Sequence, residues 1–163
     1  MARARVIGVG NEIAGDDAAG PAVIEALRGR VPDDVELINA GCDALGVLPH
    51  LEEEVHTIIV DAARMGRAPG EVAVFGAEKA RVRILADAWS LHGIGLAYVL
   101  QLAERMRLPA RITIVGIEPA GVEPGQAMSP VVAAAIPRAV ESVESILRIQ
   151  NEAGAAPCTK RRN

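Results

Sequence analysis

The sequence predicts a three-layer α/β fold, in which a twisted, mostly parallel sheet of about five strands lies between helices on both faces. Short apolar segments typical of strands alternate along the chain with segments whose apolar residues recur at helical spacing. Hydrophobic residues make up 50% of the 163 residues and aromatic residues only 2%, so Ala, Val, Ile and Leu must build the core. We expect one domain over residues 1–150 and a disordered tail over residues 151–163, where apolar content is low.

Five segments have the patterns of strands. Residues 6–10 are an apolar run that ends in glycines, and residues 35–38 form a second apolar run. Residues 56–61 are β-branched and nearly all apolar, which is typical of a strand buried on both faces. Residues 71–75 alternate in polarity after a Pro-Gly turn and are expected near a sheet edge, and residues 112–117 form the fifth strand.

Helical spacing predicts three helices between these strands. Residues 18–27 form the first, and Pro21 suits its first turn because the missing N–H would have no partner there. Residues 45–53 predict a short helix with an irregular start. A longer helix is expected to begin near His92 and to end at Pro109.

The last predicted helix begins at Ser129-Pro130 and runs to about Ile149. Pro137 lies inside this segment, where its ring and its missing N–H disturb a helix. We therefore expect the helix to be kinked or divided at this point.

The composition excludes several classes of function. The net charge is −4 and the pI about 5.4, and the one basic cluster, residues 160–162, is short, so we expect no nucleic-acid partner. Cys42 and Cys158 form neither a disulfide framework nor a CxxC zinc pair. The sequence has neither the pattern of a signal peptide nor an apolar stretch of about 18 residues. We expect a cytoplasmic protein with no membrane partner.

Three carboxylates and one imidazole occupy the positions where a parallel sheet gathers its binding groups. Asp16 and Asp17 lie in the loop after the first strand, Asp61 ends the third strand, and His92 opens the long helix. Loops at the carboxyl ends of parallel strands meet at one edge of a sheet. Carboxylate oxygens with one imidazole nitrogen suit a divalent ion such as Ni²⁺, Zn²⁺ or Mn²⁺, and composition does not select among them.

The first loop argues against a dinucleotide site. Gly8-x-Gly10 begins the G-x-G-x-x-G pattern, but Ile13 stands where the third glycine is needed, and Asp16 and Asp17 would repel a phosphate. The chain also lacks the P-loop, H-E-x-x-H and G-x-S-x-G motifs, which mark many nucleotide-binding proteins, zinc proteases and serine hydrolases.

Five motifs follow one another along the chain: Gly8-Val9-Gly10-Asn11, Gly15-Asp16-Asp17-Ala18-Ala19-Gly20-Pro21, Ile58-Ile59-Val60-Asp61-Ala62, Ser90-Leu91-His92-Gly93-Ile94-Gly95-Leu96 and Val115-Gly116-Ile117-Glu118-Pro119. In this order they resemble the hydrogenase maturation proteases, and the resemblance spans residues 4–149. It implies a phosphorylase/hydrolase-like fold. It also implies an endopeptidase that removes a C-terminal extension from the nickel-loaded large-subunit precursor of a [NiFe]-hydrogenase, with nickel supplied by that precursor.

The resemblance also implies roles for individual residues. By position, the nickel-recognising acid of the family falls on Asp17, the second acid on Asp61 and the histidine on His92. Two ways of activating the attacking water stay open: the metal activates it, or a carboxylate such as Asp16 acts as the general base. Many relatives have Asp-Gly-Gly where this chain has Asn39-Ala40-Gly41, which argues against an acid–base role for the second loop.

The same residues also have structural explanations. Asp16 and Asp17 are suited to stabilise the positive end of a helix, and Asp61 is suited to cap a turn. Cys42 has no activating base in the sequence and fits a small residue in a tight turn. Glu118 either orients a ligand, binds the precursor or is solvated surface.

Two other functions also fit these residues. A non-catalytic nickel-sensing chaperone or binding module would use the same ligands and leave the precursor uncut. An exopeptidase or a germination-type protease would cleave unrelated peptides. We expect a monomer whose complex with the precursor is transient, since the partner must leave after one cleavage.

Overall fold

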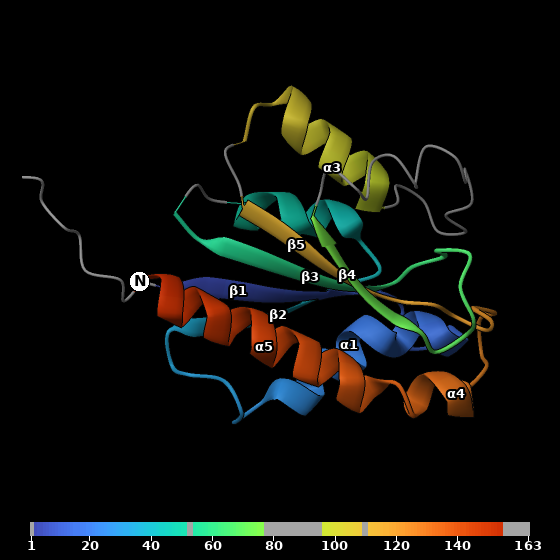
Figure 1. The fold of residues 1–163 in the computed structure, drawn as a ribbon. Helices are drawn as coiled ribbons and strands as arrows, with labels where there is room; N and C mark the ends of the chain where they lie inside the picture. The colour runs from blue at the N-terminus through green and yellow to red at the C-terminus, as the bar shows by residue number, and fades with distance from the viewer. Residues whose placement is uncertain (1, 52–53, 77–95, 109–110, 155–163) are drawn as a thin grey trace, which may run out of the picture.

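The fold is a single five-stranded sheet with helices on both faces, as a computed structural model of the chain shows (Figure 1). The structure describes residues 2–51, 54–76, 96–108 and 111–154. Within these ranges the strands lie in the order β2-β1-β3-β5-β4. The predicted α/β class, with a mostly parallel sheet between helices, is therefore confirmed.

The strands lie close to their predicted positions. Four of them pair in parallel, and β4 runs antiparallel to β5 at one edge of the sheet, where the sequence placed it. β2 forms the other edge and extends beyond its predicted end, as far as Gly41. The strands are β1 (Ala4–Val9), β2 (Val35–Gly41), β3 (His56–Ala62), β4 (Val72–Gly76) and β5 (Arg111–Ile117).

The helices divide the core into two layers. Helices α1 (Ala19–Leu27), α4 (Pro130–Ala133) and α5 (Ile136–Gly154) cover one face of the sheet, and α3 (Leu96–Arg105) with the 3-10 helix η2 (Ala44–His50) covers the other (Figure 1). Both layers consist almost entirely of Ala, Val, Ile and Leu, as the composition required. Small side chains let the helices approach the sheet closely.

Several helix boundaries differ from those predicted. The segment expected to be a short helix is a 3-10 helix that contains Pro49. The division expected at Pro137 is present, because α5 begins at Ile136 and Pro137 occupies its first turn. Helix α3 ends at Arg105, before Pro109, and its start near His92 lies outside the described residues.

The last helix is longer than predicted. Helix α5 continues past Ile149 to Gly154, so the first residues of the segment expected to be a tail are helical. Residues 155–163 lie outside the part of the chain that the structure describes. Within the described ranges, no helix has the length and apolar character needed to cross a membrane.

Candidate functional site

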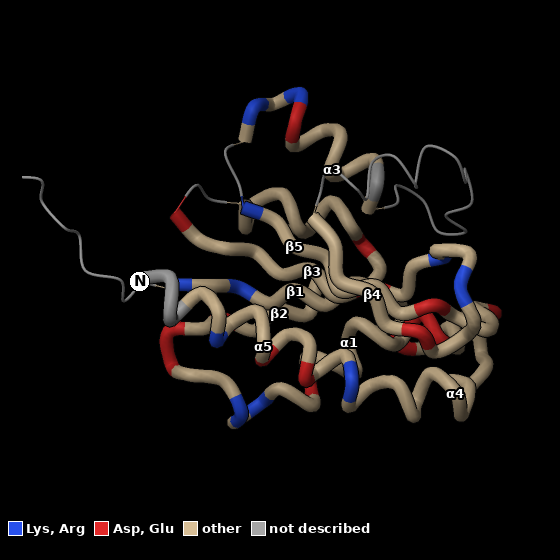
Figure 2. The backbone as a smooth tube through the Cα atoms, in the orientation of Figure 1, with Lys and Arg blue, Asp and Glu red and all other residues tan. Residues whose placement is uncertain are grey.

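The three predicted aspartates lie at the carboxyl ends of the central strands. The 3-10 helix η1 (Gly15–Ala18) follows β1 there and leads directly into α1. Figure 2 shows several acidic segments gathered at this end of the sheet, near α1 and the loop before β4. This is the edge where parallel sheets place their binding groups.

Close packing of α1 against the sheet brings two of the acids together. A Cβ atom added to Gly20 would lie 2.2 Å from the carbonyl oxygen of Val9 and 2.6 Å from that of Val60. Only glycine therefore allows the first turn of α1 to rest on β1 and β3. Asp17 lies one turn before Gly20, and Asp61 directly follows Val60, so this contact sets the approach of the two carboxylates.

The loop after β1 holds Asp17 in place. Its Oδ2 atom accepts a hydrogen bond of 2.8 Å from the backbone N–H of Asn11, and its side chain is half-buried. Gly10 has a φ of 142°, and a Cβ there would lie 1.8 Å from the carbonyl oxygen of Asp17. The Gly-x-Gly pattern therefore lets the loop fold back onto η1, and it does not form a phosphate cradle.

Asp61 has an unusual charge state for an aspartate. Burial at the end of β3 raises its pKa, and the nearby negative charge of Asp17 raises it further, to about 8. A hydrogen bond from the backbone N–H of Ala62 opposes these two effects only in part. Asp61 therefore keeps its proton to a higher pH than an ordinary aspartate does.

Asp16 lies deep in the protein and is fully hydrogen-bonded. Its Oδ1 accepts from the N–H of Ser129 at 2.6 Å, and its Oδ2 accepts from the N–H groups of Ala120 and Gly121 at 2.7 and 3.0 Å. The hydroxyl of Ser129 donates a fourth hydrogen bond of 3.0 Å. Burial alone would raise the pKa of Asp16, but these hydrogen bonds outweigh it and lower the pKa. The carboxylate thus fastens η1 to the β5–α4 loop.

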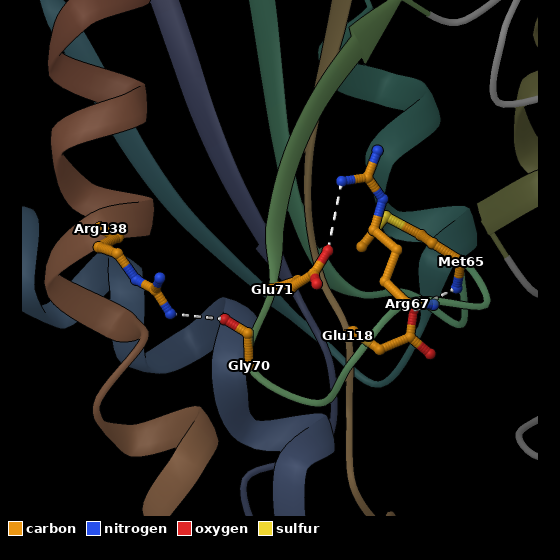
Figure 3. A network of polar contacts seen from close by, with 6 residues as sticks. All are labelled: Met65, Arg67, Gly70, Glu71, Glu118 and Arg138. Atoms are coloured by element: carbon orange, nitrogen blue, oxygen red, sulfur yellow. Dashed lines mark hydrogen bonds and ion pairs between the residues drawn. The ribbon is translucent and has the colours of Figure 1, made fainter.

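Glu118, like Asp16, holds a neighbouring loop by accepting hydrogen bonds from backbone N–H groups (Figure 3). Its buried carboxylate accepts hydrogen bonds from the N–H of Met65 at 2.6 Å and the N–H of Arg67 at 3.1 Å. The loop between β3 and β4 is thereby fixed beside the end of β5. Of the roles open to Glu118, solvated surface is wrong, because the side chain is buried.

Two arginines complete this network (Figure 3). Arg67 forms a 3.5 Å ion pair with Glu71, and Arg138 of α5 donates a 2.9 Å hydrogen bond to the carbonyl oxygen of Gly70. The second contact ties the loop before β4 to the helical layer below the sheet. The network therefore fixes the loop that leaves Asp61.

The other candidate residues lie apart from these acids or outside the described residues. His92, the predicted imidazole, lies outside the described residues. His56 lies at the start of β3, at the opposite end of that strand from Asp61, with its Nε2 2.8 Å from Thr113 Oγ1. Cys42 is exposed and free. Among the described residues, no three His, Cys, Asp or Glu side chains lie close enough together to hold a metal ion.

Three polar contacts at the site were missed by sequence reasoning. Asn11 donates to Asp17 through its backbone, Ser129 both caps α4 and binds Asp16, and Asn39 donates a 2.7 Å hydrogen bond to Glu12. The amide of Asn39 donates a hydrogen bond to the carboxylate of Glu12. The Asp that many relatives have at this position would instead repel that carboxylate. The sequence predicted that Ser129 begins a helix. Its hydrogen bonds to Asp16 were not predicted, because the two residues lie far apart in sequence.

Comparison with known proteins identifies the family. The family model described as hydrogenase maturation protease matches residues 21–146, which is most of the chain. This chain belongs to the hydrogenase maturation protease family. It is 35% identical over 150 residues to the hydrogenase 2 maturation protease of Escherichia coli K12, covering 90% of this chain and 91% of that protein. It is also 31% identical to the hydrogenase expression/formation protein HupD of Rhodobacter capsulatus, covering 90% and 71% of the two chains.

Solved structures agree with the sequence comparisons. The hydrogenase maturating endopeptidase HybD from E. coli superposes with a TM-score of 0.78 at 33% identity, covering 91% of this chain and 93% of that one. The [NiFe] hydrogenase maturation protease HycI from Thermococcus kodakarensis gives a TM-score of 0.72 at 26% identity, with 90% and 92% coverage. This hydrogenase maturation protease is therefore a hydrolase of peptide bonds, as the resemblance of its motifs implied.

Proposed function

We propose that this protease removes a C-terminal extension from the large-subunit precursor of a [NiFe]-hydrogenase after nickel has been inserted. Nickel arrives as part of the substrate and is the feature that the protease recognises. The observation that carries the proposal is the pair formed by Asp17 and Asp61, in which the pKa of Asp61 is raised to about 8 by burial and by Asp17.

A divalent cation suits this pair. The charge of Asp17 acts on the carboxyl of Asp61, so a divalent ion between the two carboxylates would favour loss of the Asp61 proton. Oxygen donors and one imidazole match the ligand preferences of nickel, and we propose His92 as the imidazole. Cleavage would then begin only when the precursor presents its metal to Asp17, Asp61 and His92.

We propose that Asp16 is a positioning residue for Asp17 and not the general base. An acceptor with a lowered pKa is a poor base near neutral pH, and all four hydrogen bonds of Asp16 would have to rearrange before it could reach water. Its carboxylate instead holds η1, and with it the neighbouring Asp17, against the β5–α4 loop. Activation of the attacking water then falls to the metal, which is the other possibility that the sequence left open.

The test is the intact mass of purified precursor after incubation with the protease. We expect nickel-loaded precursor to lose its C-terminal peptide and nickel-free precursor to keep it. Asp17→Asn, Asp61→Asn and His92→Ala should each abolish cleavage, while Asp33→Asn, an exposed acid remote from the site, should leave it unchanged.

Three outcomes would contradict the proposal. Equal cleavage of nickel-free precursor would remove nickel as the recognised feature. Nickel-dependent binding of the precursor without any loss of mass would favour the non-catalytic chaperone. Unchanged cleavage by His92→Ala would remove the histidine from the ligand set.

A further inference from the structure

The loop that carries Asp17 also displays a large apolar side chain. Ile13 is 69% exposed, the highest exposed fraction among the large hydrophobic side chains in the described part of the chain. The next residue, Ala14, is completely buried. Exposure of a branched aliphatic side chain forgoes the free energy that its burial would contribute.

The backbone around Ile13 is fixed on both sides. Its N–H donates a 3.1 Å hydrogen bond to the side-chain Oδ1 of Asn11, and its carbonyl accepts a 2.7 Å bond from the N–H of Gly125. Two residues further along the chain, the N–H of Gly15 donates a 3.1 Å hydrogen bond to the carbonyl of Gln126. The loop therefore cannot turn Ile13 toward the core without breaking contacts to the β5–α4 loop.

The same contacts join Ile13 to the acids of the site. Asn11 receives the N–H of Ile13 on its side chain and donates its own N–H to Asp17. The buried carboxylate of Asp16 fastens this loop to the β5–α4 loop, and the carbonyl of Ile13 binds that same loop at Gly125. An exposed apolar group and a proposed metal ligand are thus parts of one rigid unit.

We propose that Ile13 is a specificity-determining residue that binds an apolar side chain of the precursor, in the segment that adjoins the cleaved bond. This inference rests on the proposed function, because Asp17 places the substrate metal in the same loop as Ile13. A bound precursor covers the loop, and its apolar side chain removes water from Ile13. Recognition then has two parts. Nickel ligation requires that the metal is present, and the contact with Ile13 requires that the correct precursor polypeptide holds it.

Substitutions at Ile13 test this contact against a matched control. Ile13→Ser removes the apolar surface, and Ile13→Leu retains it with a different shape. Ile149→Ser removes a side chain of similar exposure, 65%, from the far end of α5. Each variant is mixed with nickel-loaded precursor, and both the dissociation constant and the single-turnover rate at saturating protease are measured, with thermal unfolding as a check on folding.

We expect Ile13→Ser to weaken precursor binding about tenfold, which corresponds to ~1.4 kcal/mol, with the saturated rate within about threefold of wild type. Ile13→Leu should bind within about threefold of wild type, and Ile149→Ser should bind like wild type. Wild-type binding by Ile13→Ser, or equal weakening by Ile149→Ser, would overturn the inference. A dimer of the free protease that Ile13→Ser dissociates would overturn it as well, since a second copy would then cover the residue.

Failure of this inference is separable from failure of the proposed function. If wild-type protease cleaves the precursor, Asp17→Asn does not, and Ile13→Ser binds normally, only the role of Ile13 is wrong. If wild-type protease leaves the precursor uncut, the proposed function is wrong. The binding measurement then still decides whether Ile13 contacts the precursor.

Discussion

At the scale of single residues, the three aspartates of the site differ because their surroundings differ. Asp16 is surrounded by hydrogen-bond donors and its pKa is lowered, whereas Asp61 lies half-buried near the charge of another carboxylate and its pKa is raised. Asp17 is half-buried and held by Asn11. Three identical side chains thus lie in three distinct environments.

The first prediction concerns the coupling between Asp17 and Asp61. In metal-free protein, Asp17→Asn should lower the pKa of Asp61, because the neighbouring charge is gone, but should leave it above 3.8, because burial is the larger cause. Carboxyl ¹³C chemical shifts followed through a pH titration measure this pKa. An Asp61 pKa that is the same in wild type and Asp17→Asn would contradict the coupling.

The second prediction concerns Asp16. Asp16→Asn replaces one carboxylate oxygen, which accepts hydrogen bonds, by an NH2 group that would face N–H donors. We therefore expect a loss of about 2–4 kcal/mol in the free energy of unfolding. Urea denaturation at pH 7 measures this loss, with Asp33→Asn as the exposed control. A loss below about 0.5 kcal/mol would show that the hydrogen bonds of Asp16 contribute little to the fold.

At the scale of elements, the contact of α1 with β1 and β3 is the structural basis of the site. Gly20 lets backbone meet backbone at this contact, and the acids before and beside it follow from that approach. The loops after β1, β3 and β5 are then fixed by the buried carboxylates of Asp16 and Glu118. The site therefore consists of short loops that are each fastened to a neighbour.

The third prediction tests this contact. Gly20→Ala should lower the free energy of unfolding by about 3 kcal/mol or more, because its Cβ would overlap the carbonyl oxygens of Val9 and Val60. Gly46→Ala is the matched control, since the nearest atom to a Cβ there is 3.9 Å away, and it should change stability by no more than about 0.5 kcal/mol. Chemical denaturation of both variants provides the comparison, and equal effects would refute the role of Gly20.

At the scale of the whole molecule, the proposed site lowers stability. A carboxyl whose pKa is raised by folding binds a proton in the folded state that it has released in the unfolded state. Asp61 therefore costs the fold no stability below pH 3.8, where the carboxyl is protonated in both states. Stability is lost progressively as the pH rises from there toward the folded pKa of about 8. The lowered pKa of Asp16 acts in the opposite direction, since its contribution is lost in acid.

The fourth prediction follows from this linkage. Between pH 6.5 and 8, metal-free wild-type protein should lose about 1.6 kcal/mol of stability, because the folded state must keep a proton on Asp61 that the unfolded chain has already released. Asp61→Asn removes this ionisation, so its stability should change less over the same range and should exceed that of wild type at pH 8. Thermal unfolding at several pH values measures both curves, and parallel curves would contradict the raised pKa of Asp61.

Local patterns were sufficient to predict most of the fold. The apolar periodicity of residues 56–61 and 112–117 placed two central strands, and the Ser-Pro pair at 129–130 placed the start of α4. Helix ends were less accurate, because α5 continues to Gly154, beyond the last residue of the apolar stripe that marked the helix in the sequence. The position of Asp17 and Asp61 at one edge followed from the rule for parallel strands.

The sequence by itself determined the α/β class, the family and the candidate acids, because these depend on periodicity and on motifs that are local in the chain. Only the tertiary structure decided how Asp16 and Asp61 behave, since the pKa of a carboxyl depends on burial and on partners distant in sequence. Ser129 lies 113 residues from Asp16, and no local pattern connects them. The exposure of Ile13 likewise follows from the β5–α4 loop that holds its backbone, so only the folded chain reveals it.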